Sequence, residues 1–205
     1  MHMKTINITE QHALLNALLV THGTQLHYRK GIRNHCLACL MLEAGLRVGE
    51  VVKLRIGDLW FGKAPVATLI ITSDVSKTGI EGEVPVSTRL QKAIINLHKV
   101  LWEPNQRPAN AFAMTWKNAN HPMTTRQVER IIRDAAIRSI GRPVHPHVLR
   151  HTFATKLMRV TDLRTVQELL RHKRITSTQV YTHPDSTDMR TAIDRLNDGP
   201  CAQNC

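Results

Sequence analysis

The sequence predicts a mainly helical domain with one small antiparallel sheet. The sheet is indicated by two runs rich in β-branched residues, VATLIITSDV and GEVPVS, within residues 58–87. The segment SKTGIEG between them carries the glycines of a hairpin turn. On both sides of this region, apolar residues recur at helical spacing and the segments begin with capping residues. These two patterns together favour the α-rich fold class.

Two helices are predicted before the sheet, over residues 9–23 and 28–44. Thr9 is expected to open the first helix and Gly23 to end it. Gly45 is expected to stop the second, because glycine readily takes the left-handed conformation found after helix ends.

Three more helices follow from their capping signals. Arg47 begins a short one, Ser87 caps one that runs through Trp102, and Thr124 or Thr125 caps TRQVERIIRDAAIRSIG. The C-terminal third is then expected to form helices over residues 145–159, 162–172, 176–181 and 186–196. We assign residues 1–196 to one domain and residues 197–205 to a flexible tail.

Charge is the main compositional signal. The 205 residues carry 28 Lys+Arg against 16 Asp+Glu, a formal charge of +12. Residues 1–121 hold 14 basic and 8 acidic side chains, and residues 122–196 hold 14 and 7. Because the charge is spread over the folded body, a polyanionic partner such as double-stranded DNA is favoured, although many basic proteins bind no nucleic acid.

Membrane and disulfide classes are not indicated. No apolar run approaches the ~18 residues that span a bilayer, and the first residues lack an apolar signal core. A cytoplasmic, nucleoid-associated protein is expected. Cys36 and Cys39 suggest zinc by spacing, but CLACLMLEAGL reads as a buried helix face without a second ligand pair. Cys201 and Cys205 lie in the polar tail, and we expect neither a metal nor a cofactor.

One set of side chains suits metal-free phosphodiester chemistry. Two arginines with imidazole donors match the charge that develops on a phosphate under attack. A tyrosine hydroxyl supplies a nucleophile that forms a covalent phosphate ester. The chain has only Tyr28 and Tyr181, and the polar segment QVYTHP around Tyr181 argues against its burial.

A helix that begins at Pro146 places two of these groups together. His147 and Arg150 fall about 60° apart on it, beside an apolar stripe that includes Leu149 and Phe153. Taken alone, this pair is compatible with an ordinary solvated face. His147 and His151 also have zinc-protease spacing, but the glutamate that serves there as base is absent.

Three segments in order carry a family resemblance: AGLRVGEVVKLRIGDL, HPHVLRHTFATKL and LLRHKRITSTQVYTH. With them, residues 9–196 resemble the catalytic domain of the tyrosine recombinases, the phage integrase family, whose DNA breaking-rejoining fold is implied. The length is similar to that of the fimbrial-type recombinases. Larger relatives carry a core-binding domain upstream, whereas only 46 residues precede Arg47 here. We therefore expect no such domain, weaker DNA binding by the chain alone, and reliance on protein–protein contacts or on a host architectural protein.

The resemblance implies a role for each of six residues: Arg47, Lys77, His147, Arg150, His172 and Tyr181. The two arginines hold the scissile phosphate, the histidines assist, and Tyr181 is the nucleophile. Lys77, on the hairpin, protonates the departing 5′ oxygen, unless it is only an exposed turn lysine. Glu50, three residues after Arg47, is placed to brace its guanidinium by an ion pair.

One position departs from the family pattern. Arg171 stands where the family usually has glycine before the histidine, which implies strain if the backbone there has positive φ. We expect Arg171 to contact DNA phosphate together with Lys173 and Arg174.

The resemblance implies a site-specific DNA recombinase, an integrase, excisionase or invertase, acting through a 3′-phosphotyrosine in a homotetramer on synapsed DNA. Two alternatives stay open. One is a type IB topoisomerase, which relaxes DNA as a monomer with little site preference. The other is a non-catalytic DNA-binding regulator derived from a recombinase. The chain is also compatible with a fragment of a longer integrase.

Overall fold

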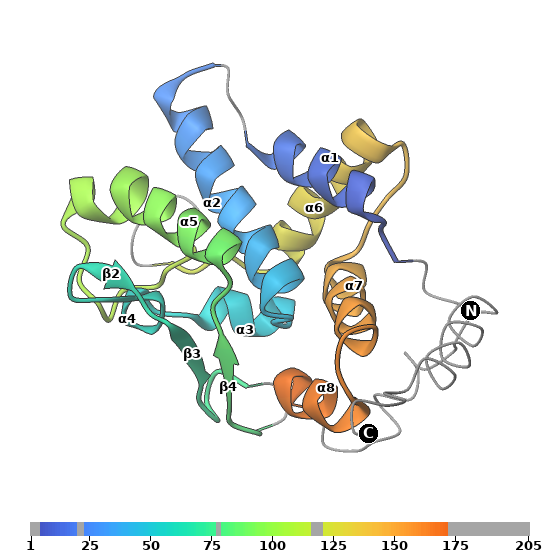
Figure 1. Cartoon of the computed structure of the whole chain (residues 1–205). Helices are drawn as coiled ribbons and strands as arrows, with labels where there is room; N and C mark the ends of the chain where they lie inside the picture. Colours follow the sequence, from blue (N-terminus) through green and yellow to red (C-terminus); the bar gives the residue numbers. More distant parts are fainter. Residues whose placement is uncertain (1–4, 20–22, 77–78, 116–120, 172–205) are drawn as a thin grey trace, which may run out of the picture.

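The computed structural model describes residues 5–19, 23–76, 79–115 and 121–171. Within them the chain is mainly helical with two small antiparallel sheets, which confirms the predicted fold class. Helix α2 (Gln25–Glu43) lies at the centre, and α1 (Ile8–Leu18), α5 (Thr88–Leu97) and α7 (Pro146–Met158) pack around it (Figure 1). No helix in these ranges is long and apolar enough to cross a membrane.

The start of α1 corrects a prediction. Asn7, and not Thr9, caps the helix: its side chain accepts a hydrogen bond from the Glu10 amide at 2.8 Å. The Glu10 carboxylate accepts in return from the Asn7 amide at 2.9 Å. This reciprocal capping box requires an acid three residues after the cap, a spacing that Asn7 meets and Thr9 does not.

Helix α2 confirms the buried-helix interpretation of the cysteines. It begins after Thr24, three residues before the predicted start at residue 28, and Gly45 follows its end with φ +60°. Cys36 and Cys39 are both fully buried in the core, and burial raises the pKa of the Cys39 thiol to about 12.

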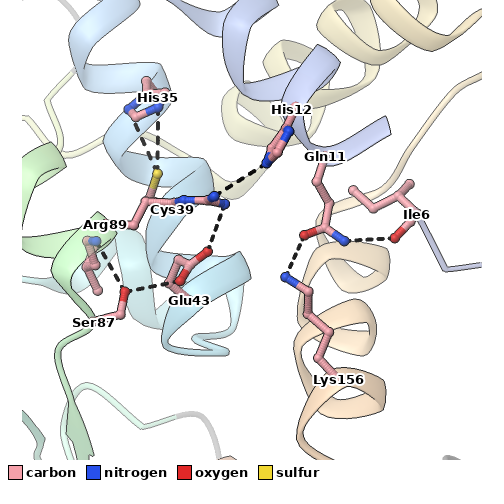
Figure 2. A network of polar contacts seen from close by, with 10 residues as sticks. Ile6, Gln11, His12, His35, Cys39, Glu43, Ser87, Arg89 and Lys156 are labelled. Atoms are coloured by element: carbon pink, nitrogen blue, oxygen red, sulfur yellow. Dashed lines mark hydrogen bonds and ion pairs between the residues drawn. The ribbon is translucent and has the colours of Figure 1, made fainter. Parts of the chain in front are cut away.

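Polar contacts join α1, α2, α5 and α7 to one another (Figure 2). Arg89 at the start of α5 reaches Glu43 of α2 and His12 of α1, each at 3.4 Å. On the other side, Lys156 of α7 donates to Gln11 of α1 at 2.7 Å. These bonds connect α5 to α2 and α1, and α7 to α1.

The predicted hairpin is present. Strands β3 (Thr68–Ile71) and β4 (Gly82–Pro85) pair antiparallel, with Leu69 opposite Val84 and Ile71 opposite Gly82. Leu69, Ile71 and Val84 are buried, so one face of the hairpin joins the core. The sequence did not predict α4 (Ile56–Leu59) or the short pair β1 (Trp60–Phe61) and β2 (Ala64–Pro65), because two-residue strands have no periodicity.

The connection after the sheet begins as predicted. Ser87 caps α5 by accepting from the Leu90 amide at 3.2 Å. The helix then continues as a π-helical turn, His98–Trp102, and a 3₁₀ turn, Glu103–Asn105. Trp102 is buried there and donates its indole N–H to the Ala113 carbonyl at 3.3 Å.

The last described helices match their predicted segments. Thr124, rather than Thr125, caps α6 (Thr125–Ile140), and Gly141 ends it with φ +72°. Helix α7 follows, and α8 (Leu163–Leu170) packs against both α7 and β4 (Figure 1). The helices predicted over 176–181 and 186–196 lie outside the described residues.

Candidate active site

Arg47 stands at the N-terminus of α3 (Val48–Lys53), directly after the turn at Gly45 that ends α2. Its Nη1 donates to Glu50 Oε1 and its amide donates to Glu50 Oε2, each at 2.8 Å. The predicted i, i+3 ion pair is therefore confirmed. The Glu50 side chain is fully buried, whereas that of Arg47 is 14% exposed, so the brace lies inside the protein and the arginine reaches its surface.

A second guanidinium, that of Arg171, also pairs with the Glu50 carboxylate. Nη2 of Arg171 lies 2.9 Å from Glu50 Oε2, and both side chains are buried. Burial alone raises the pKa of the Glu50 carboxyl, but Arg171 and the hydrogen bonds from Arg47 outweigh it and hold the pKa below its usual value. Glu50 is therefore an anion that holds two cations in place.

Arg150 lies on the buried side of α7, 5% exposed. Its Nη1 donates to the Gly45 carbonyl, and its Nη2 donates to the Leu170 carbonyl at 2.5 Å. Gly45 is two residues before Arg47, and Leu170 is two residues before His172. One guanidinium thus joins two segments that sequence alone separates by more than a hundred residues.

His147 lies one turn before Arg150 on α7 and is exposed. Its ring stacks parallel to that of His145, with 6.3 Å between the centroids. His147 and Arg150 thus lie on one helix as predicted, but His147 is exposed and Arg150 is buried.

Several predicted residues lie outside the described ranges: Lys77, His172, Lys173, Arg174 and Tyr181. The roles that we expect for these five stay predictions. Arg171 is the last described residue, and its surroundings differ from those expected. Its guanidinium is buried against Glu50, because that carboxylate supplies an acceptor inside the protein; the side chain does not lie on an open surface where DNA phosphate is expected.

Two hollows lie near these residues. The larger, about 830 Å³, lies between β4 and the face of α8, and Gly82, Leu169 and Arg171 are among its lining residues. The smaller, about 480 Å³, lies at the N-terminal part of α6. In the described ranges, no three His, Cys, Asp or Glu side chains gather as metal ligands.

The smaller hollow lies in a basic surface that was not predicted from the sequence. Its lining includes Arg126, Arg130 and Arg133 of α6 and His145, all four exposed, together with Glu129. Arg133 also pairs with Asp134 at 3.0 Å. The arginines are four and three residues apart, a spacing that brings them to one helix face. This periodicity was the signal that would have found them.

The chain is similar to known recombinases along most of its length. The sequence pattern of the phage integrase family matches residues 11–188. Tyrosine recombinase XerC of Pediococcus pentosaceus is 32% identical over 179 residues, which cover 85% of this chain and 56% of that protein. Tyrosine recombinase XerA of Pyrococcus furiosus is 29% identical, with 81% and 55% covered. The chain therefore spans about half the length of these relatives.

Solved structures agree with the fold. A crystal structure of XerA recombinase superposes with a TM-score of 0.71 at 25% identity, covering 97% of this chain and 64% of that one. The Tn1549 transposon integrase, in complex with transposon right end DNA, superposes with a TM-score of 0.69 at 21% identity, covering 95% and 66%. The second likeness supports the fold alone. Together with the sequence match, they establish that this chain belongs to the phage integrase family and has the fold of the tyrosine recombinase catalytic domain.

Proposed function

We propose that this chain cuts and rejoins double-stranded DNA as a site-specific recombinase. The observation that carries the proposal is the pair of hydrogen bonds from Arg150 to the Gly45 and Leu170 carbonyls. They bind the segment of Arg47 and the segment that leads to His172 and Tyr181 to one helix. The family membership and the names of the relatives support the same activity.

In this proposal, the Tyr181 hydroxyl oxygen attacks the phosphorus of a scissile phosphodiester. Its proton passes to His147, the bond from phosphorus to the 5′ oxygen breaks, and Lys77 protonates that oxygen. Arg47 and Arg150 stabilise the charge on the non-bridging oxygens, with His172 beside them. Attack by the 5′-hydroxyl of a partner strand on the 3′-phosphotyrosine reverses the step and rejoins the DNA. No outside energy source is required, because the ester bond conserves the phosphodiester energy.

The surface charge supports DNA as the partner. The exposed arginines at the 480 Å³ hollow, Arg126, Arg130 and Arg133, present cations along one face of α6. Cations at this spacing suit a row of phosphates, and their neutralisation would make binding strongly dependent on salt. Strand exchange further implies a synaptic tetramer, with residues 186–196 as the segment that docks on a neighbouring subunit.

The test is capture of a covalent protein–DNA adduct. The probe is a library of nicked duplexes with randomised sequence, in which cleavage releases a short strand and prevents religation. We expect the wild-type chain to form an adduct that survives detergent, and the Tyr181→Phe variant to form none. Tyr28→Phe is the matched control, because Tyr28 on α2 is the other tyrosine and is 46% exposed.

Each other outcome identifies an alternative. An adduct that persists in Tyr181→Phe would refute the nucleophile. Relaxation of plasmids that lack the captured sequence would favour a type IB topoisomerase. DNA binding without an adduct from any variant would favour the non-catalytic regulator.

A further inference from the structure

We propose that Arg171 is a positioning residue, whose buried guanidinium fixes the backbone turn after α8 to the carboxylate that holds Arg47. Glu50 then fixes the positions of two segments through ion pairs, the N-terminus of α3 and the end of α8. The catalytic consequence of this coupling rests on the function proposed above, but the coupling itself does not.

The backbone at Arg171 needs an explanation. Its φ of 52° and ψ of 50° lie in the left-handed region, which glycine adopts freely and other residues rarely do. Its amide closes the helix by donating to the Gln167 and Glu168 carbonyls. A glycine would meet this backbone requirement with less strain, so the arginine side chain must supply a compensating interaction.

That compensation is visible in the side chain. Nη2 donates to Glu50 Oε2 at 2.9 Å across 121 residues of sequence, and Nη1 donates to the Leu169 carbonyl at 3.2 Å. Nε is buried and has no hydrogen-bond partner among the described residues. The guanidinium is therefore fixed chiefly by its contact with Glu50, since its other bond is to a neighbouring carbonyl.

Strand β4 leaves room for this side chain. A Cβ placed on Gly82 would lie 2.8 Å from Cγ and 2.9 Å from Cδ of Arg171, too close for any real contact. The arginine stem thus passes over a position where β4 has no side chain. Only with glycine at residue 82 does the guanidinium have this path to Glu50.

The turn is anchored at two successive residues. Arg150 holds the Leu170 carbonyl, and Arg171 holds Glu50. Because the first anchor belongs to α7 and the second to α3, the backbone of residues 170 and 171 is fixed relative to both helices. Loss of Arg171 removes the α3 anchor and leaves the α7 anchor.

The first measurement needs no catalysis. Hydrogen–deuterium exchange is followed in peptides covering α3 and the end of α8, for wild type, Arg171→Gly and Arg164→Ala. Arg164 is the matched control, because it is an exposed arginine of α8 whose one ion pair among the described residues is with Glu168. We expect Arg171→Gly to speed exchange in both peptides together, with α1 and α6 unchanged, and Arg164→Ala to leave all of them as in wild type.

The second measurement separates positioning from DNA contact. The substrate is a DNA sequence captured in the adduct assay. For wild type and each variant, we compare the rate of adduct formation at saturating DNA and the DNA concentration that gives half of this rate. We expect Arg171→Gly to slow the rate by about 10- to 100-fold, as for a slightly misplaced catalytic group, with little change in half-saturation. Arg171→Lys should recover part of the rate, since it keeps the charge but loses the planar fork.

Gly82→Ala is the third variant, because it displaces the Arg171 side chain without changing either charged partner. It should reproduce the rate loss of Arg171→Gly, and the double variant should be no slower than Arg171→Gly alone. Weaker DNA binding at an unchanged rate would overturn the proposal and make Arg171 a phosphate contact. Unchanged exchange in α3 would also overturn it, whether or not the wild type forms an adduct. Coupled exchange without any adduct would support the coupling and refute only the proposed function.

Discussion

Replacing Gly45 with alanine tests how the turn before Arg47 is built. Gly45 has a φ of +60°, and an added Cβ would lie 2.3 Å from Cδ1 and 2.6 Å from Cε1 of Phe153. It would also approach the Leu170 side chain at 3.2 Å. The substitution therefore introduces two separate penalties, a strained backbone and a collision with α7.

Each penalty has a known size. A left-handed conformation destabilises a residue other than glycine by about 1–2 kcal/mol. Overpacking of a filled site destabilises by about 1–3 kcal/mol. The free energy of unfolding should thus fall by about 2–5 kcal/mol, which for a chain of this size lowers the midpoint of thermal unfolding by roughly 4–20 °C.

Gly141→Ala is the matched control, because Gly141 also has positive φ, +72°, but an added Cβ there would meet nothing within 4 Å. It should lose only the backbone part, about 1–2 kcal/mol. Urea unfolding followed by circular dichroism gives both free energies, and their difference measures the collision. Equal losses in the two variants would refute the reasoning, since Phe153 would then move aside without penalty.

Two further predictions concern the brace and a helix cap. Since the pKa of Glu50 is lowered in the folded protein, its ionised form stabilises the fold above the unfolded pKa of about 4.3, and this stabilisation disappears as the pH falls through the folded value. Urea unfolding between pH 3 and 7 should therefore show wild type losing its advantage over Glu50→Gln at the acid end; a constant gap would contradict this. Ser87→Ala should lower the free energy of unfolding by about 1 kcal/mol, because the Ser87 hydroxyl caps α5 and also donates to Glu43 at 3.1 Å. Ser87→Gly is its control, and should lose less than alanine because glycine tolerates the cap position.

Local patterns predicted most of the helices. The features that carry these predictions depend only on residues nearby in the sequence. Examples are the capping serine at residue 87, the glycine after α6 and the buried cysteines of α2. The cap of α1 is also set locally, because Asn7, unlike Thr9, has a glutamate three residues further along the chain. Short elements were missed for another reason. Strands of two residues are defined by their partner and not by their own sequence.

The contacts of the site also divide into local ones, which the sequence predicts, and long-range ones, which it does not. The Arg47–Glu50 pair was predictable, because both groups lie on one turn of a helix. The Arg171–Glu50 pair was not, because its partners are 121 residues apart and become neighbours only through packing. Nor does a sequence indicate that the guanidinium of Arg150 is held by two backbone carbonyls. The family pattern selected the residues, and the tertiary structure determines what holds them.

Two of the long-range bonds of the site lie at the end of α8, the one from Arg150 to the Leu170 carbonyl and the one from Arg171 to Glu50. That helix is anchored by a small hydrophobic cluster of its own, in which Val166 and Leu170 pack on Phe153 and Ala154 of α7. The large core around α2 holds α3 and hence Arg47, and Leu169 of α8 packs against that core as well. Docking of α8 therefore completes the arginine arrangement. Because burial of so few apolar groups stabilises α8 only modestly, the charged bonds from Arg150 and Arg171 supply much of what keeps it in place. The same contacts that order the site thus also attach the helix leading to the proposed nucleophile.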